Sequence, residues 1–153
     1  MAVHDMYHEE SVVIAASRET VYDTIRQLER MGEWSPESTG GEWTSGDGTS
    51  VGDQFDGVNK IGDRVWTATA TVLRADPGEA FTFHTGPSDN MMAEWSYLIE
   101  DADGGSKVTE VWEVHVLPPT LAEASAEQLA GRAAMVQESM RTTLAGLKAT
   151  LES

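Results

Sequence analysis

Residues 93–116 of the chain read AEWSYLIEDADGGSKVTEVWEVHV, and this stretch decides what kind of fold can form. Apolar side chains alternate with polar ones over 93–100 and again over 107–116, which is typical of β-strands with one buried face. The intervening DADGG at 101–105 is rich in turn-forming residues. The stretch therefore predicts an antiparallel hairpin that buries aromatic side chains on one face.

Five segments before this hairpin also have the length and residue types of strands. They span residues 8–16, 37–44, 54–60, 64–73 and 80–85. Short turns such as Asp76-Pro77-Gly78 separate the later segments, and connections this short leave no room for crossover helices. We therefore expect seven strands in an antiparallel sheet.

Two helices complete the pattern. Ser17 is a suitable N-cap, and apolar residues recur at helical spacing from there to about Met31. After Pro118-Pro119, with Thr120 as the cap, residues 121–151 predict a long helix with one apolar stripe. The inner face of the sheet must be covered, and only this helix is long enough. The expected fold class is α+β, with a seven-stranded antiparallel sheet wrapped around a long C-terminal helix.

Composition restricts the partners of the chain. It has 153 residues, no cysteine and a formal net charge of −16, and its length fits a single domain over residues 1–153. The negative charge argues against nucleic acid and anionic membrane surfaces, because both need clustered lysine and arginine. The N-terminal MAVHDMYHEE lacks the basic residues of a signal peptide, and no apolar run approaches about 20 residues. We expect a cytoplasmic protein without membrane insertion.

Metal and cofactor motifs are not found in the sequence. Glu113 and His115 share a face of one strand, but no third ligand lies at a suitable spacing for zinc. No glycine-rich loop connects a strand to a helix, and no Gly-x-Ser-x-Gly motif is present. We therefore expect neither a metal nor a cofactor.

Several stretches along the chain together resemble a known family. They are residues 17–22 (SRETVY), 34–36 (WSP), 51–59 (VGDQFDGVN), 76–79 (DPGE), 95–97 (WSY), 104–106 (GGS) and 108–112 (VTEVW), followed by the closing helix with Leu144, Leu147 and Leu151. With these stretches, nearly the whole chain resembles the START-related (SRPBCC) superfamily and, more narrowly, its polyketide cyclase/dehydrase family. The resemblance implies a helix-grip fold with an internal apolar cavity and a hydrophobic small molecule as partner. It implies no common catalytic set, because members of the superfamily share only the cavity.

Strand alternation and the apolar stripe of the long helix, combined with the cavity that the resemblance implies, give the candidate site residues. Those expected to contact a ligand are Phe55, Asn59, Trp66, Phe81, Phe83, Trp95, Trp112, Val136, Met140 and Leu144. Glu110 and Tyr97 are the candidate catalytic residues, as a proton carrier and a hydrogen-bond donor for cyclisation and dehydration of a poly-β-ketone. The alternative is structural: Glu110 is bonded to a neighbour such as Asn59, and the ring of Tyr97 only packs.

Two other functions stay open at this point. One is a carrier or sensor of lipids or other small molecules that performs no chemistry. The other is a protein-interaction module resembling the chaperone ATPase-activator branch of the superfamily, which predicts a dry core and an exposed apolar patch. In each case we expect a monomer or a weak homodimer.

Overall fold

The computed structural model describes residues 6–86, 92–117 and 121–153. Its seven strands are β1 (Tyr7–Ile14), β2 (Ser38–Ser45), β3 (Gln54–Ile61), β4 (Arg64–Asp76), β5 (Ala80–Thr85), β6 (Ala93–Ala102) and β7 (Gly105–Val114). They form one antiparallel sheet in the order β1-β7-β6-β5-β4-β3-β2. The prediction of seven antiparallel strands is confirmed.

The first helical region is divided in two. Helix α1 (Arg18–Ile25) begins at Ser17, whose side chain accepts a hydrogen bond from the Thr20 N–H, as the sequence predicts. The following turn is a 3-10 helix, η2 (Leu28–Glu33), instead of a continuation of α1. Both short helices lie between β1 and β2 along the chain, and η2 packs against β2.

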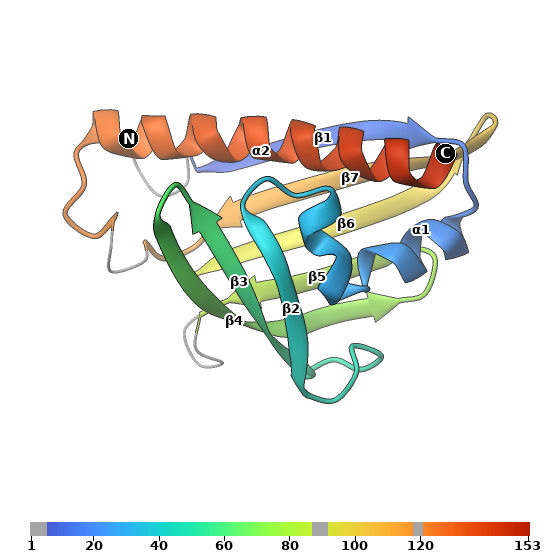
Figure 1. The fold of residues 1–153 in the computed structure, drawn as a ribbon, viewed down its shortest axis with the longest axis horizontal. Helices are drawn as coiled ribbons and strands as arrows, with labels where there is room; N and C mark the ends of the chain where they lie inside the picture. Colours follow the sequence, from blue (N-terminus) through green and yellow to red (C-terminus); the bar gives the residue numbers. More distant parts are fainter. Residues whose placement is uncertain (1–5, 87–91, 118–120) are drawn as a thin grey trace.

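The long helix α2 (Ala126–Glu152) begins later than predicted. The predicted start at Leu121 is wrong, because Ser125 and Gln128 form a reciprocal capping box that fixes the first turn at Ala126. The predicted cap, Thr120, lies outside the described residues. Figure 1 shows α2 running lengthwise beside β1, with β2, β3 and β4 at the opposite side of the sheet.

Side chains of α2 form hydrogen bonds with the backbone along the free edge of β1 and just after its end. The Lys148 Nζ donates to the Val13 carbonyl at 2.7 Å, and the Ala15 N–H donates to Glu152 Oε2 at 2.9 Å. These bonds occupy backbone groups that an edge strand otherwise leaves free. On another side of the helix, Gly146 lies so close to Trp34 that an added Cβ would be 2.9 Å from the Trp34 Cα.

The buried apolar side chains form two clusters. The large cluster contains Ile14, Val21, Tyr22, Ile25, Leu28, Trp34, Phe55, Ala70, Val72, Phe81, Phe83, Tyr97, Ile99, Val108, Leu144 and Leu147. The small cluster contains Met6, Trp112, Val114, Leu129, Ala133, Val136 and Met140. Trp95 is partly buried and packs against both clusters. The core therefore consists of two apolar clusters, and α2 contributes side chains to both.

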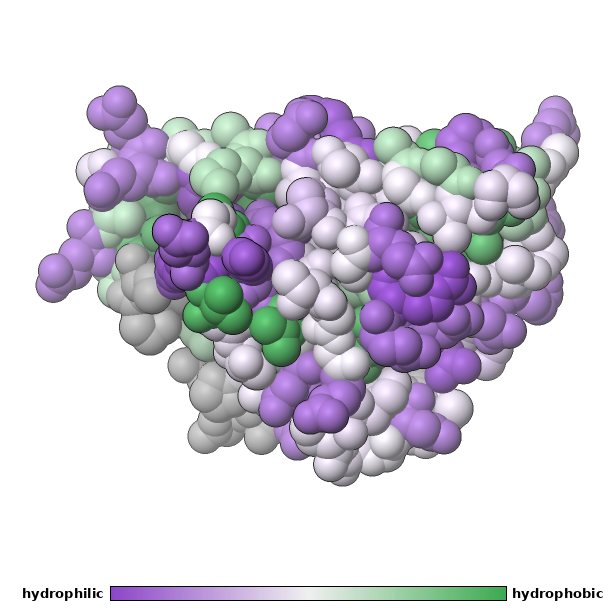
Figure 2. Space-filling view, in the orientation of Figure 1, coloured by the Kyte–Doolittle hydropathy of each residue, from purple (hydrophilic) through white to green (hydrophobic). Residues whose placement is uncertain are grey.

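The surface agrees with the net charge of −16. Figure 2 shows hydrophilic residues over much of one face, and strongly hydrophobic residues there form only small separate groups. The exposed large apolar residues of the described chain are spread over β1, β4, β6, α2 and two loops: Tyr7, Val13, Val51, Val65, Leu98, Val116 and Met135.

Candidate functional site

Glu110 lies in β7 at the boundary between the two apolar clusters. On the same face of the strand, Val108 belongs to the large cluster and Trp112 to the small one. The Glu110 side chain is buried, and its Oε1 has no hydrogen-bond partner among the described residues. Across the sheet it lies opposite Tyr97 of β6 and Glu10 of β1.

Burial dominates the electrostatics of Glu110. Burial raises the pKa of this carboxyl to about 8. A hydrogen bond from the Tyr97 hydroxyl favours the ionised carboxylate and lowers the pKa, but this effect is smaller. At pH 7 the carboxyl is therefore mostly protonated, and it can both donate and accept a hydrogen bond. A neutral carboxylic acid at neutral pH is the protonation state that a general acid requires.

Tyr97 supplies the second interior polar group. Its ring belongs to the large cluster, and its hydroxyl faces Glu110. Burial, together with the nearby Glu110, raises the pKa of Tyr97 well above the ordinary value. The hydroxyl therefore remains a hydrogen-bond donor throughout the physiological range of pH.

Aromatic rings line one side of this pair. Phe81 lies opposite Tyr97 in register, and its ring centroid is 5.8 Å from that of Phe83. Phe83 in turn lies 5.2 Å from Phe55 in an edge-to-face contact. Such contacts add to the stability gained from burial of the rings, and they form a rigid apolar wall.

Most of the other residues predicted to contact a ligand are divided between the two clusters. Trp112, Val136 and Met140 lie in the small cluster, Leu144 lies in the large one, and the Trp95 and Trp112 rings are 6.3 Å apart. Trp95 and Trp112 are paired in register, two residues along β6 and β7 from the pair of Tyr97 and Glu110.

Asn59 and Trp66 lie elsewhere. They are paired in register where β3 meets β4, and the Arg64 guanidinium lies 4.8 Å from the centroid of the Trp66 ring. The suggested bond between Asn59 and Glu110 is wrong: β3 is four strands from β7 in the sheet, and Glu110 Oε1 has no partner among the described residues.

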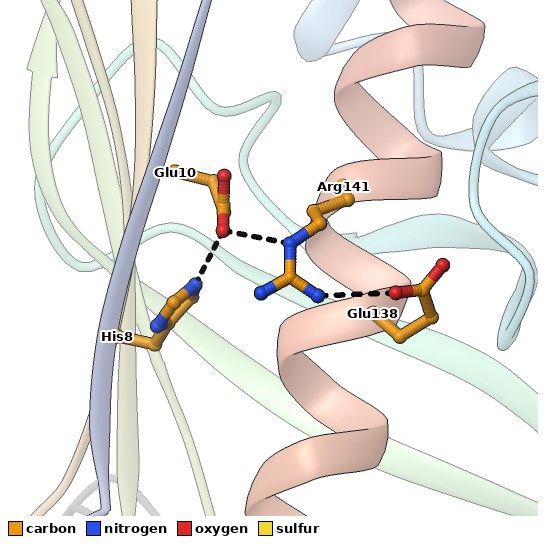
Figure 3. Close-up of polar contacts among 4 residues, drawn as sticks. All are labelled: His8, Glu10, Glu138 and Arg141. Atoms are coloured by element: carbon orange, nitrogen blue, oxygen red, sulfur yellow. Dashed lines mark hydrogen bonds and ion pairs between the residues drawn. The ribbon is translucent and has the colours of Figure 1, made fainter.

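A second group of polar side chains lies at the seam between β1 and α2 (Figure 3). His8 Nε2 lies 2.7 Å from Glu10 Oε1, Arg141 Nε donates to the same oxygen at 3.0 Å, and Arg141 Nη1 donates to Glu138 at 3.0 Å. The hydrogen bond from His8, followed by the charge of Arg141, lowers the pKa of Glu10. Sequence analysis missed this group, although His8 and Glu10 share the inward parity of Ile14.

A groove of about 450 Å³ opens along the same seam. Its lining residues are Glu10, Ser11, Val12, Arg141, Leu144, Ala145, Lys148, Ala149 and Glu152. Leu144 is the one predicted ligand-contacting residue in this lining. Because the groove lies at the surface, the closed cavity between sheet and helix stays a prediction.

Residues 6–86, 92–117 and 121–153 contain no group of three or more histidine or acidic side chains arranged to hold a metal ion. In the same residues, no helix combines the length and apolarity needed to cross a membrane.

The fold defines a class of protein, the helix-grip domains, in which an antiparallel sheet packs around a long C-terminal helix. The family model described as polyketide cyclase / dehydrase and lipid transport matches residues 8–152. The chain therefore belongs to this family. No curated protein matches it.

Solved structures agree with this assignment. A polyketide-cyclase-like protein from Corynebacterium glutamicum, Cgl2372, is 27% identical and superposes with a TM-score of 0.69 over 96% of this chain and 91% of its own. Two di-domain aromatase/cyclases have the same fold at lower identity. BexL of the BE-7585A biosynthetic pathway is 17% identical with a TM-score of 0.73, and StfQ of the steffimycin pathway is 14% identical with a TM-score of 0.75. The match covers 96% of this chain and 50% of each of those two, so it spans about half of their length.

Proposed function

We propose that this protein binds a hydrophobic small molecule of polyketide, lipid or aromatic type between the sheet and α2, and that it acts on a polyketide ligand as a cyclase and dehydratase. The family and the aromatase/cyclase neighbours support this role. We also propose that it works as a single cytoplasmic domain, monomeric or weakly dimeric, without nucleic acid or membrane insertion.

One observation carries the proposal. Glu110 is 3% exposed, yet its Oε1 has no hydrogen-bond partner in the described residues. A buried polar atom without a hydrogen-bond partner lowers the stability of the fold. Burial among apolar side chains keeps the Glu110 carboxyl protonated at neutral pH. A purely structural acid would be expected to satisfy both oxygens, whereas an acid that serves a ligand keeps one available.

The proposed chemistry is proton transfer within a folded poly-β-ketone. In the aldol step, Glu110 gives its proton to the carbonyl oxygen under attack while the enol carbon of the same chain forms the new C–C bond. The enol O–H proton then returns to the Glu110 carboxylate. In the dehydration, Glu110 protonates the leaving hydroxyl and its carboxylate takes the proton from the adjacent carbon, so water leaves and Glu110 is regenerated.

Tyr97 and the aromatic wall have supporting roles in this mechanism. The Tyr97 hydroxyl donates a hydrogen bond towards the oxygen at which charge develops. Phe81, Phe83 and Trp95 hold the flexible chain in the bent shape that brings its reacting carbons together, which lowers the entropic part of the barrier.

The test is turnover of a synthetic aryl-capped triketone followed by chromatography and mass spectrometry. Wild type is expected to accelerate cyclisation with loss of water, and Glu110→Gln to lose about 100-fold or more of that acceleration. Glu100→Gln, which changes an exposed acid on β6, is the matched control. Saturable binding without any acceleration would reject the cyclase role and support a carrier, and absence of binding would favour the protein-interaction module.

A further inference from the structure

The interior has two apolar clusters of side chains, with a pair of polar groups at the boundary between them. Val108 and Leu144 belong to the large cluster, whereas Trp112 and Met140 belong to the small one. Glu110 lies between Val108 and Trp112 on β7, opposite the Tyr97 hydroxyl. A molecule that packs against both clusters therefore meets these two polar groups near its middle and not at one end.

The charge of the interior favours an uncharged ligand. The buried polar and charged residues of the described chain are Thr24, Ser38, Thr71, Thr82, His84, Ser96, Ser106, Glu110 and Thr143, and they include no lysine or arginine. A ligand carboxylate placed beside Glu110 would have no cation to pair with, and an unpaired buried charge is strongly unfavourable.

The nearest charged groups belong to the seam between β1 and α2. On β1, Glu10 and His8 lie opposite Glu110 and Trp112, and they bond to each other. On α2, Arg141 is already engaged by Glu10 and Glu138. On β6 the facing titratable group is Tyr97, a donor that stays neutral. Arg141 is thus held by two carboxylates, and Lys148 at the same seam bonds to the Val13 carbonyl and to Glu152, so neither cation is free for a ligand.

We propose, on the basis of the binding role above, that the ligand is an uncharged molecule with a hydrogen-bonding oxygen near its middle and an apolar part on each side. Glu110 determines this specificity by donating a hydrogen bond to that oxygen. Amphipaths with a terminal carboxylate, such as fatty acids, are rejected.

Three probes of similar size test the proposal in titrations followed by tryptophan fluorescence. They are 1,3-diphenylacetone, with a central carbonyl between two phenyl arms, 1,3-diphenylpropane, which lacks the carbonyl, and 6-phenylhexanoate, with a terminal carboxylate. At pH 7 the ketone is expected to bind wild type roughly threefold to tenfold more tightly than the hydrocarbon, the range expected for one hydrogen bond. The carboxylate is expected to bind at least tenfold more weakly than the ketone.

Variants at Glu110 separate specificity from folding. Since the pKa of Glu110 is about 8, the ketone advantage of wild type is expected to disappear at pH 9.5, where the carboxyl has lost its proton. Glu110→Gln keeps a neutral donor and should retain the advantage at both pH values, whereas Glu110→Leu should remove it at both.

The outcomes distinguish this inference from the proposed function. If no probe binds wild type, ligand binding itself is rejected. If the three probes bind equally, or the carboxylate binds best, ligand binding stands and a neutral, centrally oxygenated ligand is rejected. An unchanged ketone advantage in Glu110→Leu would also overturn the role of Glu110.

Discussion

Glu110 on β7 lies directly opposite Tyr97 on β6, and both side chains are buried in the interior. Cross-strand neighbours of this kind have Cβ atoms about 4.5–5.5 Å apart, so the carboxyl and the phenol form one local polar unit. The unit is surrounded by apolar side chains of both clusters. Its protonation state therefore responds to burial more than to any neighbouring charge.

Stability should depend on pH through Glu110. Its pKa is about 8 in the folded state and near the ordinary 4.5 when unfolded, so between these values the native state binds more protons. The free energy of unfolding is then expected to fall as pH rises from 6 to 8, by up to about 1.4 kcal/mol per pH unit. Urea unfolding at pH 6, 7 and 8 measures this slope.

Glu110→Gln is the control for that slope. The variant has no proton to lose, so its unfolding free energy should change much less over the same range. The carboxyl groups with lowered pKa values, Glu10, Glu33, Asp47 and Glu152, titrate below this range of pH. The histidines are present in both proteins, so their contribution cancels in the comparison. Equal slopes for wild type and variant would contradict a raised pKa at Glu110.

The two glycines of α2 should respond oppositely to alanine. An added Cβ at Gly146 would lie 2.9 Å from the Trp34 Cα, whereas the space around Gly131 is open. Gly146→Ala is therefore expected to destabilise by about 1–3 kcal/mol through overpacking. Gly131→Ala should stabilise by up to about 1 kcal/mol, since alanine is the better helix former.

Thermal and urea unfolding of the two variants measures the difference. Because both substitutions are the same change in one helix, a general effect of alanine on helix formation cancels in the comparison. Equal stabilisation by both would mean that α2 does not approach Trp34 as closely as described.

Truncation of the aromatic wall should be costly. Phe81 is fully buried, and its ring lies 6.3 Å from Tyr22 and 5.8 Å from Phe83. Phe81→Ala is expected to lower the free energy of unfolding by about 3–5 kcal/mol. The control is Val65→Ala, at an exposed site of β4, whose free energy of unfolding should stay within about 0.5 kcal/mol of wild type. If Phe81→Ala also lowered the free energy of unfolding by no more than about 0.5 kcal/mol, the Phe81 ring would not be part of the core.

The alternation of residue types was sufficient to predict the inward faces of the strands. Glu110 and Trp112 are buried on the face expected from 107–116. The turn-forming residues likewise marked the ends of the later strands. These features are local, so a single sequence carries them.

Features that depend on distant pairing were not predictable. β1 pairs with β7 although about 100 residues separate Glu10 from Glu110, and no local pattern specifies that partner. The same pairing places His8 and Glu10 beside α2, so the seam group was missed. The start of α2 was misplaced for a different reason: Leu121 and Ala124 continue the apolar spacing, but they pack against the small cluster from outside the helix.

The central claim is that a hydrophobic ligand binds between the sheet and α2, and methyl NMR of the protein titrated with hydrophobic probes tests it most directly. Saturable shifts are predicted at interior methyl groups of both clusters, those of Val108, Val136 and Met140, with little change at the exposed Val51 and Val65. Shifts confined to Val12, Leu144, Ala145 and Ala149 would place the ligand in the surface groove instead. That result, or no saturable shift at all, would contradict the claim.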